Sequence, residues 1–581
     1  MIKTLAQQIK QYKKPTFLTI LFTALEVVLD IFLPICMAHI IDDGIQNSDM
    51  NCIIKYGIIM AILSILAFFC GVISGRLCAK ASTGFAYNLR REIFTRIQNF
   101  SFANIDRFST AGLITRLTTD VNQMQMAYQM IIRMCVRSPL NLLFALIMAM
   151  TINVRMSLIF VVTIIVLVIS LIILIKFAMK TFRSVFGEYD NLNASIQENI
   201  RGIRVVKSFV REEHEINKFN RAIDRLYKMF VKAESIACVN APIMLLCVYG
   251  CTLALSFFGA KSIVGGSLTT GELSSLLYYV MNIMMSLMML SMAFVMITIA
   301  ETNCERIFQI FQETPNIKNC DNPITEVKDG SVDFENVCFK YQEGSGENAL
   351  TDINIHIKPG ETIGIIGGTG SGKSTLVNLI PRLYDATSGT VSVGGVDVKK
   401  YDIKTLRDQV SMVLQNNVLF SGTIFENLRW GDENATDEEC IEACKLACAD
   451  GFIESFPDKY NTFIERGGSN VSGGQKQRIC IARALLKKPK ILILDDSTSA
   501  VDTATEAKIQ QAFNEKISHI TKIIIAQRIS SVSKADRIIV LEDGRINGIG
   551  THEELLNSNE IYKSIVEVQS EGNADFDRQE V

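Results

Sequence analysis

A glycine-rich segment in the second half of the chain has the residue types and the spacing that bind phosphate. It follows an apolar run at 362–366 and precedes a helical pattern at 376–383, so we expect it to connect a strand to a helix. In that setting the GxxxxGK[ST] pattern lets backbone N–H groups wrap phosphate groups, and the start of the helix adds positive potential. We expect Lys373 to reach the β- and γ-phosphates of ATP, and the Ser374 hydroxyl to bind Mg²⁺. The segment consists of Gly367, Gly368, Thr369, Gly370, Ser371, Gly372, Lys373, Ser374 and Thr375.

A carboxylate that could serve the same metal ion follows a second apolar run. Residues 491–494 are Ile-Leu-Ile-Leu, and Asp495 comes directly after them. A buried strand that ends at a turn with Asp would give the same pattern. Because the chain also contains the phosphate loop, we interpret Asp495 as an acidic residue beside Mg²⁺.

A further glycine-rich helix start lies well after the first. Ser472, Gly473, Gly474 and Gln475 precede a helical pattern at 476–486, and the amino end of a helix can bind a phosphate group. One ATP does not need two such loops from one subunit. The second loop therefore requires an explanation of its own.

The composition describes a chain with a large apolar part. Of its 581 residues, 49% are hydrophobic and 20% are charged, whereas about 25% charge is usual in soluble proteins. The 58 basic and 60 acidic residues leave a net charge of −2. No overall basic surface is therefore available for nucleic acid, and we expect no nucleic-acid partner.

Six apolar stretches in the first half of the chain have about the length that crosses a membrane, which takes about 20 residues. The loop after the first stretch is acidic, whereas residues 76–137 and 176–234 are rich in Arg and Lys. Basic loops stay in the cytoplasm, so we expect a multi-pass protein of the cell membrane with both termini in the cytoplasm. The stretches lie at about 16–40, 54–76, 138–154, 156–176, 235–260 and 273–299.

The two basic segments show helical periodicity and few helix breakers. We interpret each as a helix that leaves the membrane, a turn, and a helix that returns, with a reach of about 40 Å. The turns are expected near Asp106 and Val205. We assign the chain to an α-helical transmembrane domain with six spans (1–307), a linker (308–328), an ATPase domain (329–570) and a polar tail (571–581).

With the segment VSGGQKQR at 471–478, the chain resembles an ABC exporter half-transporter over nearly its whole length. The resemblance implies that an α/β P-loop ATPase domain of ABC type follows the membrane domain, and that the two turns are coupling helices. It also implies that two ATPase domains close head to tail. Each ATP then lies between the phosphate loop of one chain and the signature loop, Ser472–Gln475, of the other. This arrangement explains the second glycine-rich loop and implies a second half-transporter as partner.

Further residues match the motifs of this family by position. Tyr341 corresponds to the aromatic residue that stacks on adenine, and Gln415 to the glutamine that senses Mg²⁺ and contacts the membrane domain. Residues 465–467 resemble the exporter X-loop, and residues 499–502, which end in Asp502, resemble the D-loop. The resemblance implies ATP and Mg²⁺ as cofactors, with the metal held by Ser374, Gln415 and Asp495.

Two positions depart from the family pattern, and both concern ATP hydrolysis. The residue after the metal-side aspartate is usually Glu, which orients or deprotonates the attacking water, but here it is Asp496. The switch position, usually His, is Gln527, and the five histidines lie elsewhere. Glutamine can hydrogen-bond a phosphate oxygen but offers neither the charge nor the proton of His. We therefore expect Asp496, Gln527 and Gln415 to form a weakly hydrolytic site.

This pattern resembles the degenerate subunit of a heterodimeric multidrug-type ABC exporter. Two alternatives remain: a homodimeric exporter with reduced hydrolysis, and a non-pumping ATP-regulated channel or regulatory subunit. The sequence contains no long regulatory insertion, which argues against the second alternative. The expected substrates are hydrophobic or amphipathic compounds, drugs or lipids, that leave the cytoplasm by alternating access.

The sixth span carries methionines on one helical face, spaced by three and four residues. Methionine adapts to irregular apolar shapes and is common at promiscuous binding surfaces. Ordinary packing or contact with lipid would give the same pattern. The residues are Met281, Met285, Met288, Met292 and Met296.

Two carboxylates, Glu26 and Asp30, share one face of the first span. Charged groups at membrane depth are costly and usually face a cavity or a partner. One interpretation is a site for cationic amphiphiles. The alternatives are pairing with Arg133 or Arg137, whose side chains we expect to reach the inner headgroups, or a place near the membrane surface.

Overall fold

The computed structural model describes residues 1–341, 346–497 and 501–577. These residues form two compact units. The first comprises Met1–Gln98 with Ser109–Glu313, and the second comprises Asn99–Phe108 with Thr314–Val581.

The division after Glu313 lies inside the expected linker 308–328. The segment Asn99–Phe108 was assigned to the transmembrane domain by sequence position, but it packs in the second unit. The contacts that hold it there are described below, with the nucleotide site.

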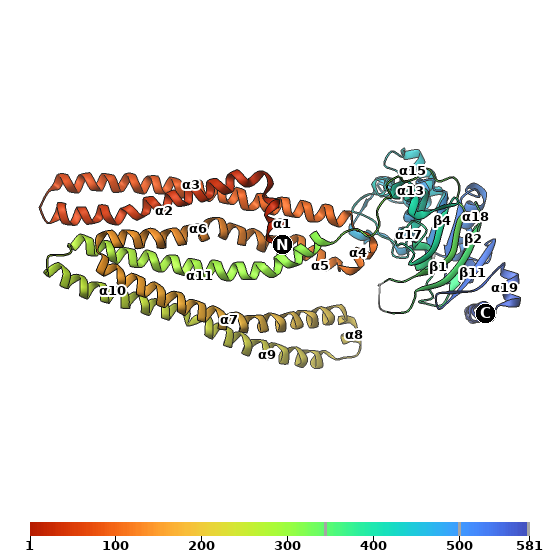
Figure 1. Cartoon of the computed structure of the whole chain (residues 1–581). Coiled ribbons are helices and arrows are strands. Elements are labelled where there is room, and N and C mark those ends of the chain that lie inside the picture. Colours follow the sequence, from red (N-terminus) through yellow and green to blue (C-terminus); the bar gives the residue numbers. More distant parts are fainter. Residues whose placement is uncertain (342–345, 498–500, 578–581) are drawn as a thin grey trace. The chain divides into compact units, whose positions relative to one another are not determined.

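The first unit is helical, and Figure 1 shows its long helices lying side by side. A helix satisfies its own backbone hydrogen bonds, which an apolar membrane interior requires. The helices are α1 (Ile2–Ala6), α2 (Lys13–His39), α3 (Met50–Gln98), α5 (Thr110–Thr115), α6 (Val121–Ile152), α7 (Val154–Arg201), α8 (Ile203–Ser208), α9 (Glu212–Cys238), α10 (Asn240–Val264) and α11 (Thr270–Gln312).

Five helical stretches are long and apolar enough to cross a membrane within the part of the chain that is described. They contain four of the six predicted spans and, except for its last two residues, the span 138–154. The remaining predicted span, 156–176, lies on α7. The described apolar stretch of this helix, Val154–Ser170, is shorter than a membrane crossing needs. The helix does not end there but continues as one helix to Arg201, and the span at 156–176 stays a prediction. The five stretches are Lys3–Ile45, Met50–Gln98, Thr110–Ile152, Glu212–Val264 and Thr270–Gln312.

Two short helices stand where the turns were predicted. The first, α4 (Phe102–Arg107), contains Asp106, and α8 contains Val205. The helices that lead to them, α3 and α7, have 49 and 48 residues. At 1.5 Å per residue each is about 70 Å long, whereas the apolar core of a membrane is about 30 Å thick. Both helices therefore extend well beyond a membrane, and the predicted turns are confirmed.

The second unit is built on two larger sheets. A six-stranded sheet has the order β12-β11-β3-β10-β9-β6 and is parallel except for β12, and an antiparallel sheet has the order β2-β1-β4-β5. The strands are β1 (Val332–Phe339), β2 (Leu350–Ile357), β3 (Thr362–Gly367), β4 (Ser388–Val393), β5 (Val396–Asp397), β6 (Val410–Val413), β7 (Gly422–Thr423), β8 (Phe463–Ile464), β9 (Ile491–Asp495), β10 (Thr521–Ile525), β11 (Arg537–Glu542) and β12 (Arg545–Gly550).

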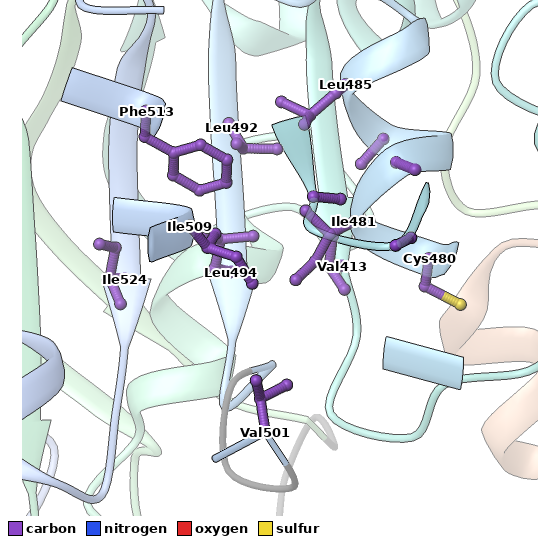
Figure 2. Packing of buried hydrophobic residues seen from close by; sticks show 14 of the residues in the cluster. Val413, Cys480, Ile481, Leu485, Leu492, Leu494, Val501, Ile509, Phe513 and Ile524 are labelled. Atoms are coloured by element: carbon purple, nitrogen blue, oxygen red, sulfur yellow. The ribbon is translucent and has the colours of Figure 1, made fainter. Parts of the chain in front are cut away.

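Helices cover the parallel sheet, and their apolar sides form the core. Figure 2 shows side chains of α17 and α18 packed against β6, β9 and β10. The interior strands β9 and β10 are buried over their whole length, as expected for parallel strands covered on both faces. The helices are α12 (Lys373–Asn378), α13 (Ile403–Gln409), α14 (Ile424–Leu428), α15 (Asp437–Leu446), α16 (Asp450–Glu454), α17 (Gly473–Leu486), α18 (Thr503–Lys516), α19 (His552–Ser558) and α20 (Glu560–Asp577).

Candidate functional site

The phosphate loop connects β3 to α12, as the sequence predicted. Gly367 ends the strand and Lys373 begins the helix. Between them Gly372 has a φ of +92°, a conformation that favours glycine. A Cβ atom at this position would also lie 2.8 Å from the carbonyl oxygen of Ala349. The loop therefore depends on glycine both for its backbone conformation and for its packing.

The Lys373 side chain lies across this loop. Its Nζ donates hydrogen bonds to the carbonyl oxygens of Gly367 at 2.8 Å and Gly368 at 2.6 Å. Burial lowers the pKa of Lys373, although the carboxylates of Asp495 and Asp496 oppose that shift. A phosphate group in the loop would give the ammonium a charge-assisted partner stronger than these carbonyls.

Asp495 ends β9 beside the first turn of α12. The Ser374 hydroxyl donates a hydrogen bond to Asp495 Oδ1 at 3.1 Å. Burial raises the pKa of Asp495, and the hydrogen bond from Ser374 opposes that shift. A hydroxyl and a carboxylate side by side are oxygen ligands of the kind that Mg²⁺ takes together with phosphate oxygens. In the described ranges no group of three or more His, Cys, Asp and Glu residues could hold a metal, so Mg²⁺ here would also need ligands from ATP.

The three residues predicted to act in hydrolysis are brought together at Asp496. This side chain is 8% exposed, and its φ of +49° is uncommon outside glycine. Gln527 Nε2 donates to Asp496 Oδ2 at 2.8 Å, and Gln415 Nε2 lies 3.4 Å from the same oxygen. Burial raises the pKa of Asp496, while the hydrogen bonds from Gln415 and Gln527 lower it. Both departures from the family pattern therefore contact each other directly.

Gln569, on α20, holds the segment that carries Gln527. Its Nε2 donates to the Gln527 carbonyl oxygen at 2.8 Å, and its Oε1 accepts from the Ile529 N–H at 2.9 Å. Gln569 could not be recognised from the sequence. No spacing or motif marks it, because α20 reaches the segment only through tertiary packing.

Tyr341 lies beside the phosphate loop with half of its surface exposed. Its hydroxyl is 2.9 Å from Thr375 Oγ1, and its ring meets that of Tyr384 edge to face with the centroids 5.3 Å apart. An exposed aromatic ring next to a phosphate loop is suited to stack on a base, so the adenine role remains the prediction for Tyr341.

Tyr384 also contacts the short helix α4. Its hydroxyl donates a hydrogen bond to Asp106 Oδ2, and its ring lies 6.1 Å from that of Phe102. Asn104 Nδ2 donates to the Thr314 carbonyl oxygen at 3.2 Å. These contacts explain why Asn99–Phe108 packs in the second unit. The aromatic group Phe339, Tyr341 and Tyr384 thus connects the expected adenine position to α4, a link that no sequence motif marks.

Replacing Tyr384 by Phe should loosen α4. The lost hydrogen bond has an exposed carboxylate as acceptor, so we expect a cost of about 1 kcal/mol. Amide hydrogen exchange at residues 102–107 should then become roughly fivefold faster. Asp106→Asn should have a similar effect, and the double variant should be little worse than either single one.

Tyr460→Phe is the matched control, because its hydroxyl donates to Asp450 elsewhere in the same unit. Exchange at 102–107 that accelerates equally in this control, or effects that add fully in the double variant, would show that the Tyr384–Asp106 contact does not hold α4.

The signature loop is a well-formed helix start. Ser472 caps α17, with its N–H donating to Gln475 Oε1 at 2.9 Å and its hydroxyl accepting from the Gln475 N–H at 3.3 Å. Within the described residues no hydrogen bond or ion pair joins this loop to Lys373 or Asp495. Among the described residues the two phosphate-binding loops thus share no direct hydrogen bond or ion pair.

The remaining predicted motifs are only partly described. Asp502 caps α18 by accepting a hydrogen bond from the Thr505 N–H at 2.9 Å. Ser499 and Ala500 of the predicted D-loop lie outside the described residues. In the predicted X-loop, the Gly467 carbonyl oxygen accepts from Lys476 Nζ at 2.7 Å, which links that loop to the helix of the signature.

Comparison with known families identifies both units. Residues 16–298 match the ABC transporter transmembrane region, and residues 350–499 match the ABC transporter family. The ABC transporter ATP-binding protein YfiB of Bacillus subtilis is 37% identical over 561 residues, which cover 97% of this chain and 97% of that protein. This chain belongs to the ABC transporter family. The putative multidrug export ATP-binding/permease protein YgaD of the same organism is 32% identical over 590 residues, covering 98% and 99% of the two chains.

The fold of this ABC transporter is also that of a solved exporter. The structure of a bacterial Atm1-family ABC exporter with ATP bound matches it with a TM-score of 0.83 and 23% identity, over 96% of this chain and 99% of the other. The predicted fold class, a helical transmembrane domain followed by an ABC ATPase domain, is confirmed. The chain is a membrane-spanning transport ATPase that binds nucleotide.

Proposed function

We propose that this ABC transporter is one subunit of a heterodimeric exporter in the cell membrane, with both termini and the ATPase domain in the cytoplasm. Its own phosphate loop binds ATP with Mg²⁺ and hydrolyses it slowly. Its signature loop completes the active site of a partner half-transporter. The complex moves hydrophobic or amphipathic compounds, drugs or lipids, out of the cytoplasm by alternating access.

The observation that carries this proposal is the direct contact between the two altered hydrolysis residues. Gln527 Nε2 and Asp496 Oδ2 lie 2.8 Å apart. The Asp496 carboxylate is one methylene shorter than that of Glu, and a misplacement of about 1 Å can cost on the order of 100-fold in rate. The amide of Gln527 can hold a carboxylate or a phosphate oxygen, but it cannot take up a proton as His does. Both departures from the family pattern therefore lower the rate of ATP hydrolysis.

The residues for ATP binding keep the types and the geometry that binding needs. Lys373 lies in the loop, and Ser374 and Asp495 are 3.1 Å apart. Tyr341 has a half-exposed ring beside them. Selective change at the hydrolysis residues, with the binding residues retained, favours a subunit that binds ATP and supports a partner.

The methionine face of α11 supports an apolar substrate. Met281, Met285, Met288 and Met292 are each at least 50% exposed, whereas Met284 beside this face is buried. Packing inside this chain therefore does not explain those four methionines. Such a face suits adaptable contact with apolar compounds, and YgaD, named for putative multidrug export, is similar over nearly the whole chain.

Hydrolysis by the purified full chain, without a partner, tests the proposal. We expect a rate at least 100-fold below the roughly 10 s⁻¹ that is typical of enzymes, while binding of an ATP analogue remains intact. Asp496→Ala should change this slow rate little. An ordinary enzymatic rate that Asp496→Ala abolishes would contradict the proposal and favour a homodimer.

A further inference from the structure

The two carboxylates of the first span share one guanidinium. Arg137 on α6 lies 2.8 Å from Glu26 Oε1 through Nη1 and 3.3 Å from Asp30 Oδ2 through Nη2. Pairing with Arg137 was one of the alternatives left open by the sequence, and it is confirmed. The Arg137 side chain is thus held by these two acids of α2.

The two acids of this ion cluster line a cavity of about 460 Å³. Glu26, Asp30 and Arg133 line it together with apolar side chains that include Phe68 and Val72 of α3. A small-molecule site typically combines an apolar wall with a few polar groups, in a volume of about 300–1,000 Å³. The cavity fits that description.

Two polar groups at this cavity have unused hydrogen-bonding capacity. Glu26 is only 7% exposed, and its Oε2 is buried without a hydrogen-bond partner. Arg133 has no carboxylate partner in the part of the chain that is described. A buried oxygen without a donor is costly, so a ligand that donates a hydrogen bond to Glu26 would be stabilised there.

The predicted span also places the cluster at membrane depth. Glu26 is ten residues into the predicted span 16–40, which corresponds to about 15 Å along the helix and about half of the apolar core. Two carboxylates and two guanidiniums balance in charge. A ligand with no net charge therefore leaves the balance of this apolar region unchanged.

We propose that this cavity binds an amphiphile whose headgroup carries both a primary ammonium and an anionic group. The ammonium donates to the Glu26 carboxylate, the anionic group binds the Arg133 guanidinium, and the hydrocarbon part lies on Phe68 and Val72. The proposal rests on the proposed export function, since an exported amphiphile must pass this depth, and it names the substrate class. Phosphatidylethanolamine of the membrane and single-chain phosphoethanolamines share this headgroup chemistry.

Binding by the purified full chain in detergent, without ATP, tests the proposal independently of hydrolysis. The probe is phosphatidylethanolamine labelled on an acyl chain, and the readout is fluorescence anisotropy. We expect it to bind at least tenfold more tightly than the choline analogue, whose quaternary nitrogen has no N–H to donate, and than the glycerol analogue, which has no ammonium. Dodecylphosphoethanolamine should compete for the site, and its affinity relative to the two-chain lipid shows which source the site prefers.

Glu26→Gln should weaken binding of the ethanolamine probe about tenfold and bring it within twofold of the choline analogue. Arg133→Gln should weaken the ethanolamine probe similarly, while leaving dodecylamine, which has no anionic group, unchanged. Glu305→Gln, an exposed acid of α11, is the control. Equal affinities for ethanolamine and choline probes, or a Glu26→Gln variant that binds as the parent does, would overturn the proposal.

A steric pair of variants tests the same site without a change of charge. A Cβ atom on Gly71 of α3 would lie 3.1 Å from Glu26 Oε1, whereas one on Gly57 of the same helix meets nothing within 4 Å. Gly71→Ala should therefore displace the carboxylate and weaken the ethanolamine probe at least fivefold, and Gly57→Ala should not. An unchanged affinity in Gly71→Ala, with the cavity intact, would also count against the proposal.

Discussion

Replacing Asp496 by Glu and Gln527 by His in the same chain should raise its ATP hydrolysis by about 100-fold. The added methylene moves the carboxylate toward the position that orients water, and the imidazole supplies a proton acceptor and donor near neutral pH. Two copies of the variant could close head to tail, because the chain retains a signature loop at Ser472–Gln475. The measurement is the steady-state release of phosphate by the purified variant.

The single substitutions should gain much less than the pair. The two residues are in contact at 2.8 Å, and contacting residues do not act additively. Gln569 forms hydrogen bonds with backbone atoms of residues 527 and 529. Because these bonds do not involve the side chain of residue 527, a His there should keep the position that Gln527 has. Lys373→Ala in the doubly substituted chain should remove the gain. A double variant no faster than the parent would show that another feature limits hydrolysis.

The core of the nucleotide site could be predicted because its residues follow neighbouring strands. Gly367 ends β3, Asp495 ends β9, and Gln415 and Gln527 come shortly after β6 and β10. These strands are adjacent and parallel in the order β3-β10-β9-β6, so their carboxyl ends meet at one edge of the sheet. Each motif was recognisable alone, and the sheet order brings them within hydrogen-bonding distance.

Other contacts could not be predicted because no local pattern encodes them. The hydrogen bond of Tyr384 to Asp106 depends on how α4 packs, and those of Gln569 to residues 527 and 529 depend on how α20 packs. The neighbours of Tyr384 and Gln569 in sequence carry no signature. The sequence likewise leaves open which arginine pairs with Glu26 and Asp30. Arg133 and Arg137 lie on one face of α6, and only the fold shows that the partner is Arg137. The predicted span at 156–176 shows a related limit: hydropathy locates an apolar stretch, but α7 continues past it without a break.

A substitution in the signature loop should impair a heterodimer far more than a substitution in this chain's own hydrolysis site. Gly474 is the second residue of α17, where an acidic side chain is favourable for the helix itself. Gly474→Asp should thus leave the fold intact but repel the phosphate of the partner's ATP. Loss of one such stabilising contact costs about 100- to 1,000-fold in rate.

Gly451→Asp is a matched control for that change. Gly451 also lies in the first turn of a helix, α16, and a Cβ atom there meets nothing within 4 Å. This variant should hydrolyse ATP as the parent complex does. Any effect of Gly474→Asp beyond that of the control can then be assigned to the signature loop.

The most direct test of the account compares two substitutions in one complex, reconstituted with a partner half-transporter that carries Glu and His at the two altered positions. ATP hydrolysis by the complex should fall at least 100-fold with Gly474→Asp in this chain, and by less than about threefold with Asp496→Ala in the same chain. That asymmetry is the expected result if this chain's signature serves the active site of its partner while its own site is weakly hydrolytic. Equal losses from the two substitutions, or a greater loss from Asp496→Ala, would contradict it.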